Sequence, residues 1–179
     1  MGCTYTSGES LNCADFNGGV KAVYFGHLSD FTSGVTVTSS EITALPTATV
    51  YEWDFRNETV LFEQTIQSEG GRVTFEQTLT IPVEAIVTEA GDATRIELLD
   101  SVIRERNVIF VLDNNDSIYM MGRVNGTNTA NGTVSTGTSL GDFNGYNLTF
   151  VAREKFQAEV LDQFASTPFD NFAATITVS

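Results

Sequence analysis

The stretch TVLFEQTIQSEGGRVTFEQTLTI, residues 59–81, decides the fold because apolar and polar side chains alternate on both sides of a Glu-Gly-Gly-Arg turn. Period-two alternation around a pair of glycines is the sequence signature of a β-hairpin. Arms of about nine residues, at about 3.3 Å per residue, extend about 30 Å, which is longer than most strands. We therefore predict an unusually long hairpin over residues 59–81.

The two faces of this hairpin differ in chemistry. On one parity only Gln64 and Gln77 interrupt the apolar side chains. We call this parity the apolar face; its members are Val60, Phe62, Ile66, Val73, Phe75 and Leu79. The opposite parity, the polar face, carries carboxylates and hydroxyls; its principal members are Glu63, Glu76, Thr65, Thr74 and Thr78. A long hairpin with one apolar and one polar face needs a functional explanation.

Composition limits the possible functions. A chain of 179 residues is expected to form a single domain, residues 1–179, and can bury about 70 % of its unfolded surface. The 23 acidic and 9 basic residues give a net charge of −14, which disfavours tight nucleic-acid binding. An acidic surface repels phosphate and so prevents sticking to DNA, although solubility alone also accounts for it.

No candidate for catalysis, cofactor binding or metal binding emerges. The one histidine, His27, ends an apolar run without a neighbouring serine or cysteine, and no nucleophile-elbow, phosphate-loop, dinucleotide or zinc-protease motif occurs. Residues 113–116, DNND, lack the glycine and distal glutamate of a calcium loop, so we expect a turn. We predict that the protein is not an enzyme and has no catalytic residues, cofactor or metal.

No membrane partner is expected either. No apolar run approaches the about 18 residues that a membrane-spanning helix needs. The start Met1-Gly2-Cys3 fits a myristoylation pattern, but no basic patch completes such an anchor. Cys3 and Cys13 are interpreted as free cysteines, because nothing indicates an oxidising compartment or a metal site.

The remaining segments favour a mainly β chain with one helix. A polar N-terminal arm covers residues 1–17, and Pro82 is expected to end the second hairpin arm. Thr94 and Glu97 form a capping box ahead of an apolar stripe, which predicts a helix over residues 94–106. The Asn-, Gly- and Thr-rich residues 124–145 are predicted to be a flexible loop, or one that assembly orders.

Three segments together resemble small structural proteins of tailed-bacteriophage virions, in particular tail-tube (major tail) proteins. They are the strand block GGVKAVYF (18–25), the long hairpin with the helix over residues 96–106 and the strand pair after it, and the run STGTSLGDFNGYNLTF (135–150). The resemblance implies a β-sandwich or barrel of two antiparallel sheets flanked by one α-helix. It also implies assembly into hexameric rings, with a long hairpin from each subunit lining a continuous channel.

The resulting functional hypothesis is a structural virion protein that forms stacked rings, the tail tube, around an acidic lumen. The polar face of the hairpin would line the lumen, and the apolar face would pack in the core or between subunits. Its partners would be further copies and other virion tail proteins, and DNA would pass through without specific binding. The protein would be made in the host cytoplasm and reside in the virion tail.

Two alternatives stay open. One is a capsid decoration or head–tail connector protein, which would bind a preformed shell or portal. The other is a carbohydrate-binding β-sandwich module, a stable monomer that would use Trp53 as its aromatic anchor.

Overall fold

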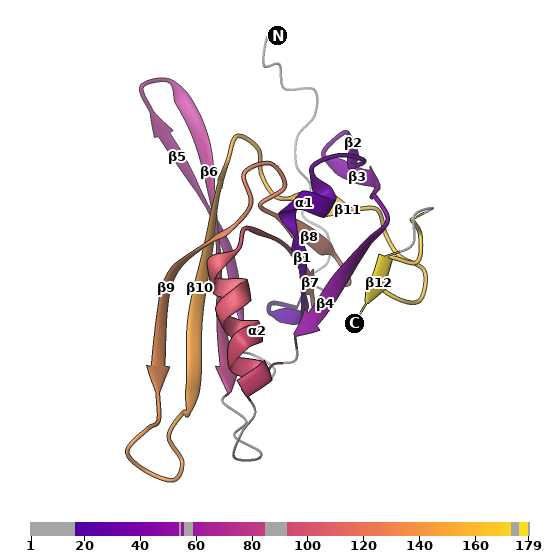
Figure 1. Cartoon of the computed structure of the whole chain (residues 1–179). Coiled ribbons are helices and arrows are strands. Elements are labelled where there is room, and N and C mark those ends of the chain that lie inside the picture. Colours follow the sequence, from indigo (N-terminus) through magenta and orange to yellow (C-terminus); the bar gives the residue numbers. More distant parts are fainter. Residues whose placement is uncertain (1–16, 54, 56–58, 85–92, 173–175, 179) are drawn as a thin grey trace.

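Two β-sheets and two short helices form the described part of the computed structural model, residues 17–53, 55, 59–84, 93–172 and 176–178 (Figure 1). The larger sheet has eight strands, in the spatial order β12 (Ile176–Val178), β4 (Ala48–Trp53), β1 (Val20–His27), β7 (Asn107–Asp113), β8 (Ile118–Met121), β11 (Glu159–Leu161), β3 (Glu41–Ala44) and β2 (Thr36–Thr38). The smaller sheet has the order β5 (Leu61–Glu69), β6 (Arg72–Glu84), β10 (Gly145–Glu154) and β9 (Asn128–Ser135). The helices are α1 (Leu28–Phe31) and α2 (Ala93–Arg104). Of the predicted N-terminal arm only Asn17 is described, so Cys3 and Cys13 lie outside the described residues.

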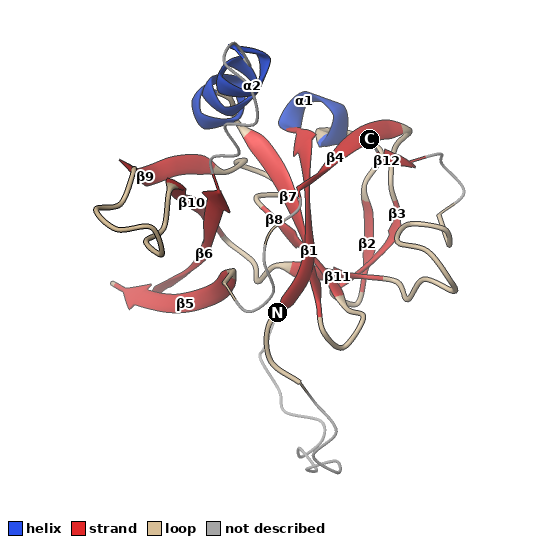
Figure 2. Ribbon diagram, turned by 90° about the horizontal axis from the view of Figure 1, so that it is seen from below, coloured by secondary structure: helices blue, strands red, loops and turns tan. Residues whose placement is uncertain are grey.

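Strands β1 and β7 are apolar on both faces because they separate two cores. Tyr24 and Phe110 point into the first core, which the curled eight-stranded sheet encloses, while Phe25 and Ile109 point into the second. The second core lies between the two sheets, where Phe150 of β10 packs on Phe25 at a ring-centroid distance of 5.3 Å. Seen along the strands, the four-stranded sheet lies beside the curled sheet (Figure 2). A continuous apolar run is the pattern expected of strands covered on both sides.

The prediction of two antiparallel sheets is wrong for the larger sheet. The four-stranded sheet is antiparallel throughout, but the eight-stranded sheet is mixed, because β11 runs parallel to β3 and β12 parallel to β4. Val160, for example, pairs with Glu41, more than a hundred positions earlier in the chain. Local alternation reports which residues form strands, whereas strand direction across such a separation depends on how the connections pack.

The long hairpin is confirmed. Strands β5 and β6 pair antiparallel from Leu61 opposite Thr80 to Glu69 opposite Arg72. Gly70 and Gly71 form the turn with φ angles of +57° and +76°, a left-handed geometry that glycine adopts without steric cost. The tip of the hairpin extends beyond the body of the molecule (Figure 1).

The prediction that Pro82 ends the second arm is wrong. Strand β6 continues to Glu84, and Pro82 lies opposite Asn147 of β10. Beyond Thr80, β6 has no described partner on its β5 side. A proline at such an edge position removes no ladder hydrogen bond on the open side, so the strand can continue through it.

The prediction of a flexible loop over residues 124–145 is wrong for its middle part. Residues 128–135 form β9, which pairs antiparallel with β10. Backbone pairing needs no apolar side chains, and a strand at the edge of a sheet can be polar on nearly all of its length. Only residues 136–144 connect β9 to β10 as a loop.

The predicted helix exists but is shorter than residues 94–106. It runs from Ala93 to Arg104, with Leu99 buried in the core between the sheets, and it lies across one open side of that core (Figure 2). Asn107 ends it, because its Nδ2 donates to the carbonyl oxygens of Val102 and Glu105 at 2.8 Å and 3.3 Å and so satisfies helix-end acceptors. The Thr94 side chain of the predicted capping box is outside the described part. No described helix is long and apolar enough to cross a membrane.

Candidate functional site

The register of the hairpin puts the five predicted polar residues on one surface. Glu63 lies opposite Thr78, Thr65 opposite Glu76, and Gln67 opposite Thr74. Directly opposite residues of an antiparallel pair project to the same side of the sheet. The five side chains therefore form one continuous strip, as their alternation in the sequence predicts.

Strands β10 and β9 extend this strip into a wide polar surface. Thr80 lies opposite Thr149, which in turn lies opposite Asn131, and Asn147 lies opposite Thr133. The hydroxyl oxygens of Thr80 and Thr149 are 3.4 Å apart, within hydrogen-bond reach. We call this surface the polar sheet face; by the strand register it comprises Glu63, Thr65, Gln67, Glu69, Arg72, Thr74, Glu76, Thr78, Thr80, Asn131, Thr133, Asn147, Thr149 and Arg153, together with the apolar Leu61 and Val151. Hydroxyl and amide groups dominate it.

The polar sheet face is less acidic than the lumen surface that the sequence predicts. Arg153 of β10 lies directly opposite Glu76, and its Nε donates to Glu76 Oε2 at 2.7 Å. Glu63 forms no ion pair within the described residues. At the tip, Glu69 lies opposite Arg72, so charges of both signs share this face. Sequence reasoning missed Arg153 because nothing local reveals which residue of a distant strand will lie opposite Glu76.

The predicted apolar face also lies on one side of the hairpin, but its members differ in burial. Leu79 is fully buried and Val60 nearly so, and Phe62 packs against them in the core between the sheets. Toward the tip, Ile66 and Val73 are 62 % and 50 % exposed. The base of the hairpin is thus part of the core, while the tip presents apolar side chains to solvent.

The two glutamines that interrupt the apolar face mark the boundary between base and tip. Gln64 and Gln77 lie opposite each other. Gln77 is buried, and its Oε1 accepts a hydrogen bond of 3.0 Å from the backbone N–H of Gly122 while its Nε2 donates to the Phe156 carbonyl at 3.5 Å. Gln64 Oε1 accepts one of 2.8 Å from the Ala158 N–H. Both glutamines therefore attach the hairpin to loops of the body.

Two buried carboxylates hold those loops in place. Glu154 Oε1 accepts hydrogen bonds from the backbone N–H groups of Val124 and Asn125 at 2.9 Å and 2.8 Å. Glu159 Oε1 accepts hydrogen bonds from Nε and Nη2 of Arg123, at 3.0 Å and 2.7 Å. Buried carboxylates with such partners are satisfied, and removing one partner would leave a costly isolated charge. These residues lie on strand ends and loops, and no pattern in the sequence singles them out.

The four-stranded sheet ends in two strands that lack an outer neighbour in the described part of the chain. These are β5 on one side and β9 on the other. The outer backbone groups of an edge strand are a ready template for pairing with another chain. Val134 of β9 adds an apolar side chain that is 67 % exposed at this edge.

The side chains described do not form a recognisable reaction centre. His27 Nδ1 lies 2.8 Å from Glu105 Oε2, and both side chains are about half exposed. Among the described residues, no group of three or more histidine, cysteine, aspartate or glutamate side chains could hold a metal ion. The polar sheet face and the two strand edges are therefore the candidate functional surfaces.

Comparison with known proteins yields no match: no family model, no curated protein and no solved structure is significantly similar to this chain.

Proposed function

We propose that this protein is a structural virion protein that assembles into stacked, hexameric rings, forming a bacteriophage tail tube that conducts DNA. The observation that carries this proposal is the four-stranded sheet with a polar outer face and two open edges. If β5 of one copy pairs with β9 of the next, the sheets join into a closed barrel, which abolishes the edges. The polar sheet face would line its lumen, and the eight-stranded sheet would lie outside.

The dimensions of such a barrel are compatible with six copies and require at least four. Four strands from each copy would give 24 strands in a hexamer, and at a spacing of about 4.8 Å these span a circumference of about 115 Å. The corresponding backbone diameter is about 37 Å, and strand tilt widens it further. Barrels gain a water-filled channel at about 16 strands. Fewer than four copies would therefore leave no conduit.

The chemistry of the polar sheet face suits a surface that DNA passes without binding. Proteins grip DNA by neutralising phosphates with lysine and arginine. On this face Arg153 is engaged by Glu76 at 2.7 Å, and threonine and asparagine side chains make up most of the rest. Arg72, opposite Glu69 at the hairpin tip, is the cation of this face without an ion pair among the described residues; the carboxylates and hydroxyls over the rest of the face offer passing phosphates no cationic partner.

Purified protein tests the proposal directly. Negative-stain microscopy and light scattering over a range of concentration and salt should reveal rings or tubules with a central bore. A strict monomer at every concentration and salt would contradict it. Val134→Lys, which puts a charge at the exposed edge of β9, should abolish ring formation while leaving the melting temperature of the monomer unchanged.

A second experiment tests the assignment of the lumen. Glu63→Lys adds a cation to the polar sheet face without disturbing an ion pair, whereas Glu76→Lys would put a lysine opposite Arg153. In assembled phage, Glu63→Lys should permit tube formation and slow DNA ejection, because the added cation binds phosphate. An unchanged rate of DNA ejection would contradict the assignment of this face to the lumen.

The alternatives have less support. A carbohydrate-binding module would need Trp53 as a free aromatic surface, but its ring packs on Phe25 at a centroid distance of 4.4 Å. A decoration or connector protein would bind a preformed shell, and the same microscopy would then reveal no self-assembly or a single ring of another order.

A further inference from the structure

The two open edges of the four-stranded sheet are staggered along the strand direction. One row of directly opposite residues crosses all four strands and consists of Leu61, Thr80, Thr149 and Asn131. From this row β5 continues to Glu69 at the hairpin tip, whereas β9 continues the other way, to Ser135 (Figure 1). Neighbouring copies must therefore be displaced along the strands if β5 of one is to pair with the whole of β9 of another.

The directions of the two edge strands suit an antiparallel junction. Each neighbouring pair in this sheet is antiparallel, so β5 and β9, with two strands between them, run in opposite directions. A rotation about the ring axis preserves these directions. The displacement must be an even number of residues, because an odd one would put polar-face side chains of one copy on the apolar side of the next.

A displacement of four residues fits both the edges and the geometry of a barrel. It places residues 61–67 of β5 opposite residues 128–135, with Ala130 as the extra residue of the bulge that β9 already contains. Four residues amount to about 14 Å, and the four strands of one copy span about 19 Å. The strands then tilt by about 35°, within the range of about 35–45° typical of barrels. A displacement of six residues would require about 47°.

A hollow of about 350 Å³ lies along the outer edge of β5. Residues 60–64 form one wall, and among the described residues none of β6 lines it, so it lies on the side of β5 that faces away from the sheet. Polar groups, Asp113 and Asn115 among them, line part of it. The apolar lining consists of Val20, Val60, Leu61, Phe62, Val111 and Tyr119. An apolar recess therefore lies beside the edge that β9 of another copy would occupy.

Val134 is the side chain of β9 that fits this hollow. It is 67 % exposed, and the strand register puts it in one row, on the apolar side of the sheet, with the buried Val83. A displacement of four residues puts Val134 directly opposite Phe62 of the next copy. A displacement of six would put it opposite Gln64, whose Oε1 already accepts a hydrogen bond of 2.8 Å from the Ala158 N–H. Burial of an exposed apolar side chain favours the four-residue register.

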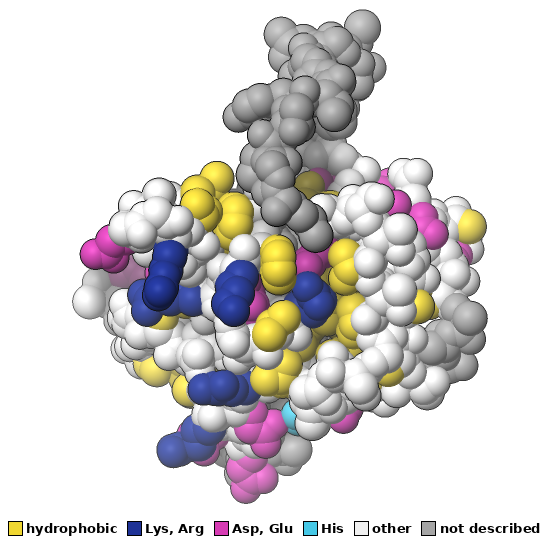
Figure 3. Space-filling view, turned by 90° about the horizontal axis from the view of Figure 1, so that it is seen from above, with side chains coloured by type: hydrophobic (Ala, Val, Ile, Leu, Met, Phe, Trp, Pro, Cys, Tyr) yellow, Lys and Arg dark blue, Asp and Glu magenta, His cyan; other side chains and the backbone are white. Residues whose placement is uncertain are grey.

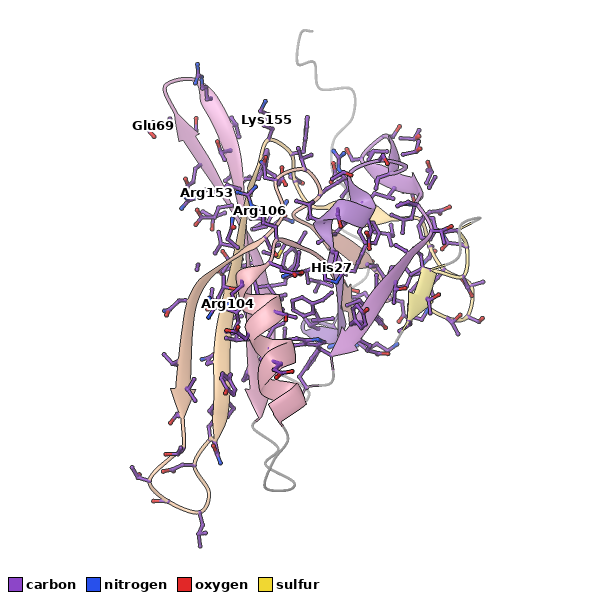
Figure 4. The ribbon with its side chains drawn as sticks, in the orientation of Figure 1. His27, Glu69, Arg104, Arg106, Arg153 and Lys155 are labelled. Carbon is purple, nitrogen blue, oxygen red and sulfur yellow. The ribbon has the colours of Figure 1, made fainter. Side chains whose placement is uncertain are left out.

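This register leaves the hairpin tip outside the junction. Ser68 and Glu69 would extend past the end of β9, and Figure 4 labels Glu69 where β5 reaches the tip. Seen from this end, apolar side chains lie among lysine and arginine side chains (Figure 3). Strand β9, NTANGTVS, carries no charge. The junction would therefore depend on backbone pairing and on the contact of Val134, and the charged tip would project beyond it.

We propose that β9 of one copy pairs antiparallel with β5 of a second copy, displaced by four residues, and that Val134 fills the hollow beside Phe62. This inference rests on the proposed function and deepens it by naming the register in which the copies meet. On the polar side Glu63 of the second copy lies opposite Thr133, and Thr65 lies opposite Asn131.

Engineered disulfides test this register. In a background with Cys3→Ser and Cys13→Ser, Glu63→Cys with Thr133→Cys should link copies into ladders on oxidation. Directly opposite Cα atoms are about 4.5–5.5 Å apart, within the reach of a disulfide. Thr65→Cys with Thr133→Cys is the matched control, because a mismatch of two residues separates the Cα atoms by more than the limit of about 7 Å. Two strands separate β5 from β9 within one copy, so every such bridge joins two copies.

The outcomes separate the register from the assembly. Ladders from the first pair alone support the proposal. Ladders from the control alone would indicate a six-residue displacement and overturn it, as would equal ladders from both. Rings without ladders from either pair would overturn the junction but leave ring assembly intact. Natural protein that forms no rings would instead refute the proposed function.

The N-terminal arm is the alternative occupant of this edge, because Asn17 lines the hollow. Glu63→Cys in a chain that retains Cys3 and Cys13 tests it by mass-spectrometric mapping of the bridges. A bridge to either cysteine that forms as fast as the ladders above would overturn the docking of β9. No such bridge, or one that forms far more slowly, supports it.

Discussion

The base and the tip of the hairpin share one alternating sequence pattern but have opposite environments. At the base Leu79 is fully buried, while at the tip Ile66 is 62 % exposed on the same side of the sheet. Gln64 and Gln77 separate the two parts and bond to the backbone of the body. The difference teaches that alternation predicts which side chains share a face, not whether anything covers that face.

Truncation of the buried base should have the largest effect. Leu79→Ala removes a fully buried side chain and should lower the free energy of unfolding by about 2–5 kcal/mol, the range for buried leucine-to-alanine changes. Ile66→Ala at the tip should change it by less than about 0.5 kcal/mol. Urea titration of both variants measures the contrast. Equal destabilisation would show that the tip is covered in the monomer too.

The boundary between base and tip should have an intermediate effect. Gln77→Ala leaves the Gly122 N–H and the Phe156 carbonyl without their partner, and an unsatisfied buried polar group costs about 1–3 kcal/mol. Gln64→Ala should cost less, because Gln64 is exposed. Hydrogen exchange should show faster exchange of the Gly122 amide in Gln77→Ala. An unchanged rate would contradict the anchoring role of Gln77.

The ion pair on the opposite face should contribute less. Glu76→Gln removes one partner of a bridge in which Arg153 is 72 % exposed, and exposed pairs contribute about 0–1 kcal/mol. The decrease in the free energy of unfolding should be smaller at high salt than at low salt, because salt screens exposed charges. Urea titration at low and high salt measures it, and a loss above about 2 kcal/mol would indicate a more buried interaction than the structure contains.

The smallest effect is expected at the far end of the sheet, where backbone and hydroxyl hydrogen bonds from Thr138 and Ser139 hold the pKa of Asp142 below its usual range. Because the pKa of Asp142 is lower in the folded protein, its carboxylate stabilises the loop fully at pH values above the unfolded pKa of about 3.9. This stabilisation is lost as the pH falls through the pKa of the folded protein. Asp142→Asn should loosen the loop at neutral pH, measured by limited proteolysis. The difference from the natural protein should disappear in strong acid; a difference that persists there would contradict this cause.

Local sequence was sufficient for part of the candidate site. The Gly70-Gly71 turn and the strict alternation predict both the hairpin and the side of each residue, because a two-residue turn defines the register. The ion pair of Arg153 with Glu76, the strand character of residues 128–135 and the continuation through Pro82 were not predictable in this way. The ion pair and the continuation through Pro82 depend on β10, a strand at least sixty residues from β6 along the chain. Strand β9 is close to β10 in the sequence, but its polar residues lack the apolar alternation that predicts a strand.

The amino-acid sequence by itself therefore determined the hairpin, its two chemically distinct faces and the apolar strands β1 and β7. Only the tertiary structure decided that the base of the apolar face is core and the tip is free, and that Arg153 of β10 pairs with Glu76 on the polar face. The physical reason is the separation along the chain over which each kind of interaction acts. Alternation and turn geometry act between near neighbours along the chain, whereas burial and ion pairing depend on which distant segments pack together.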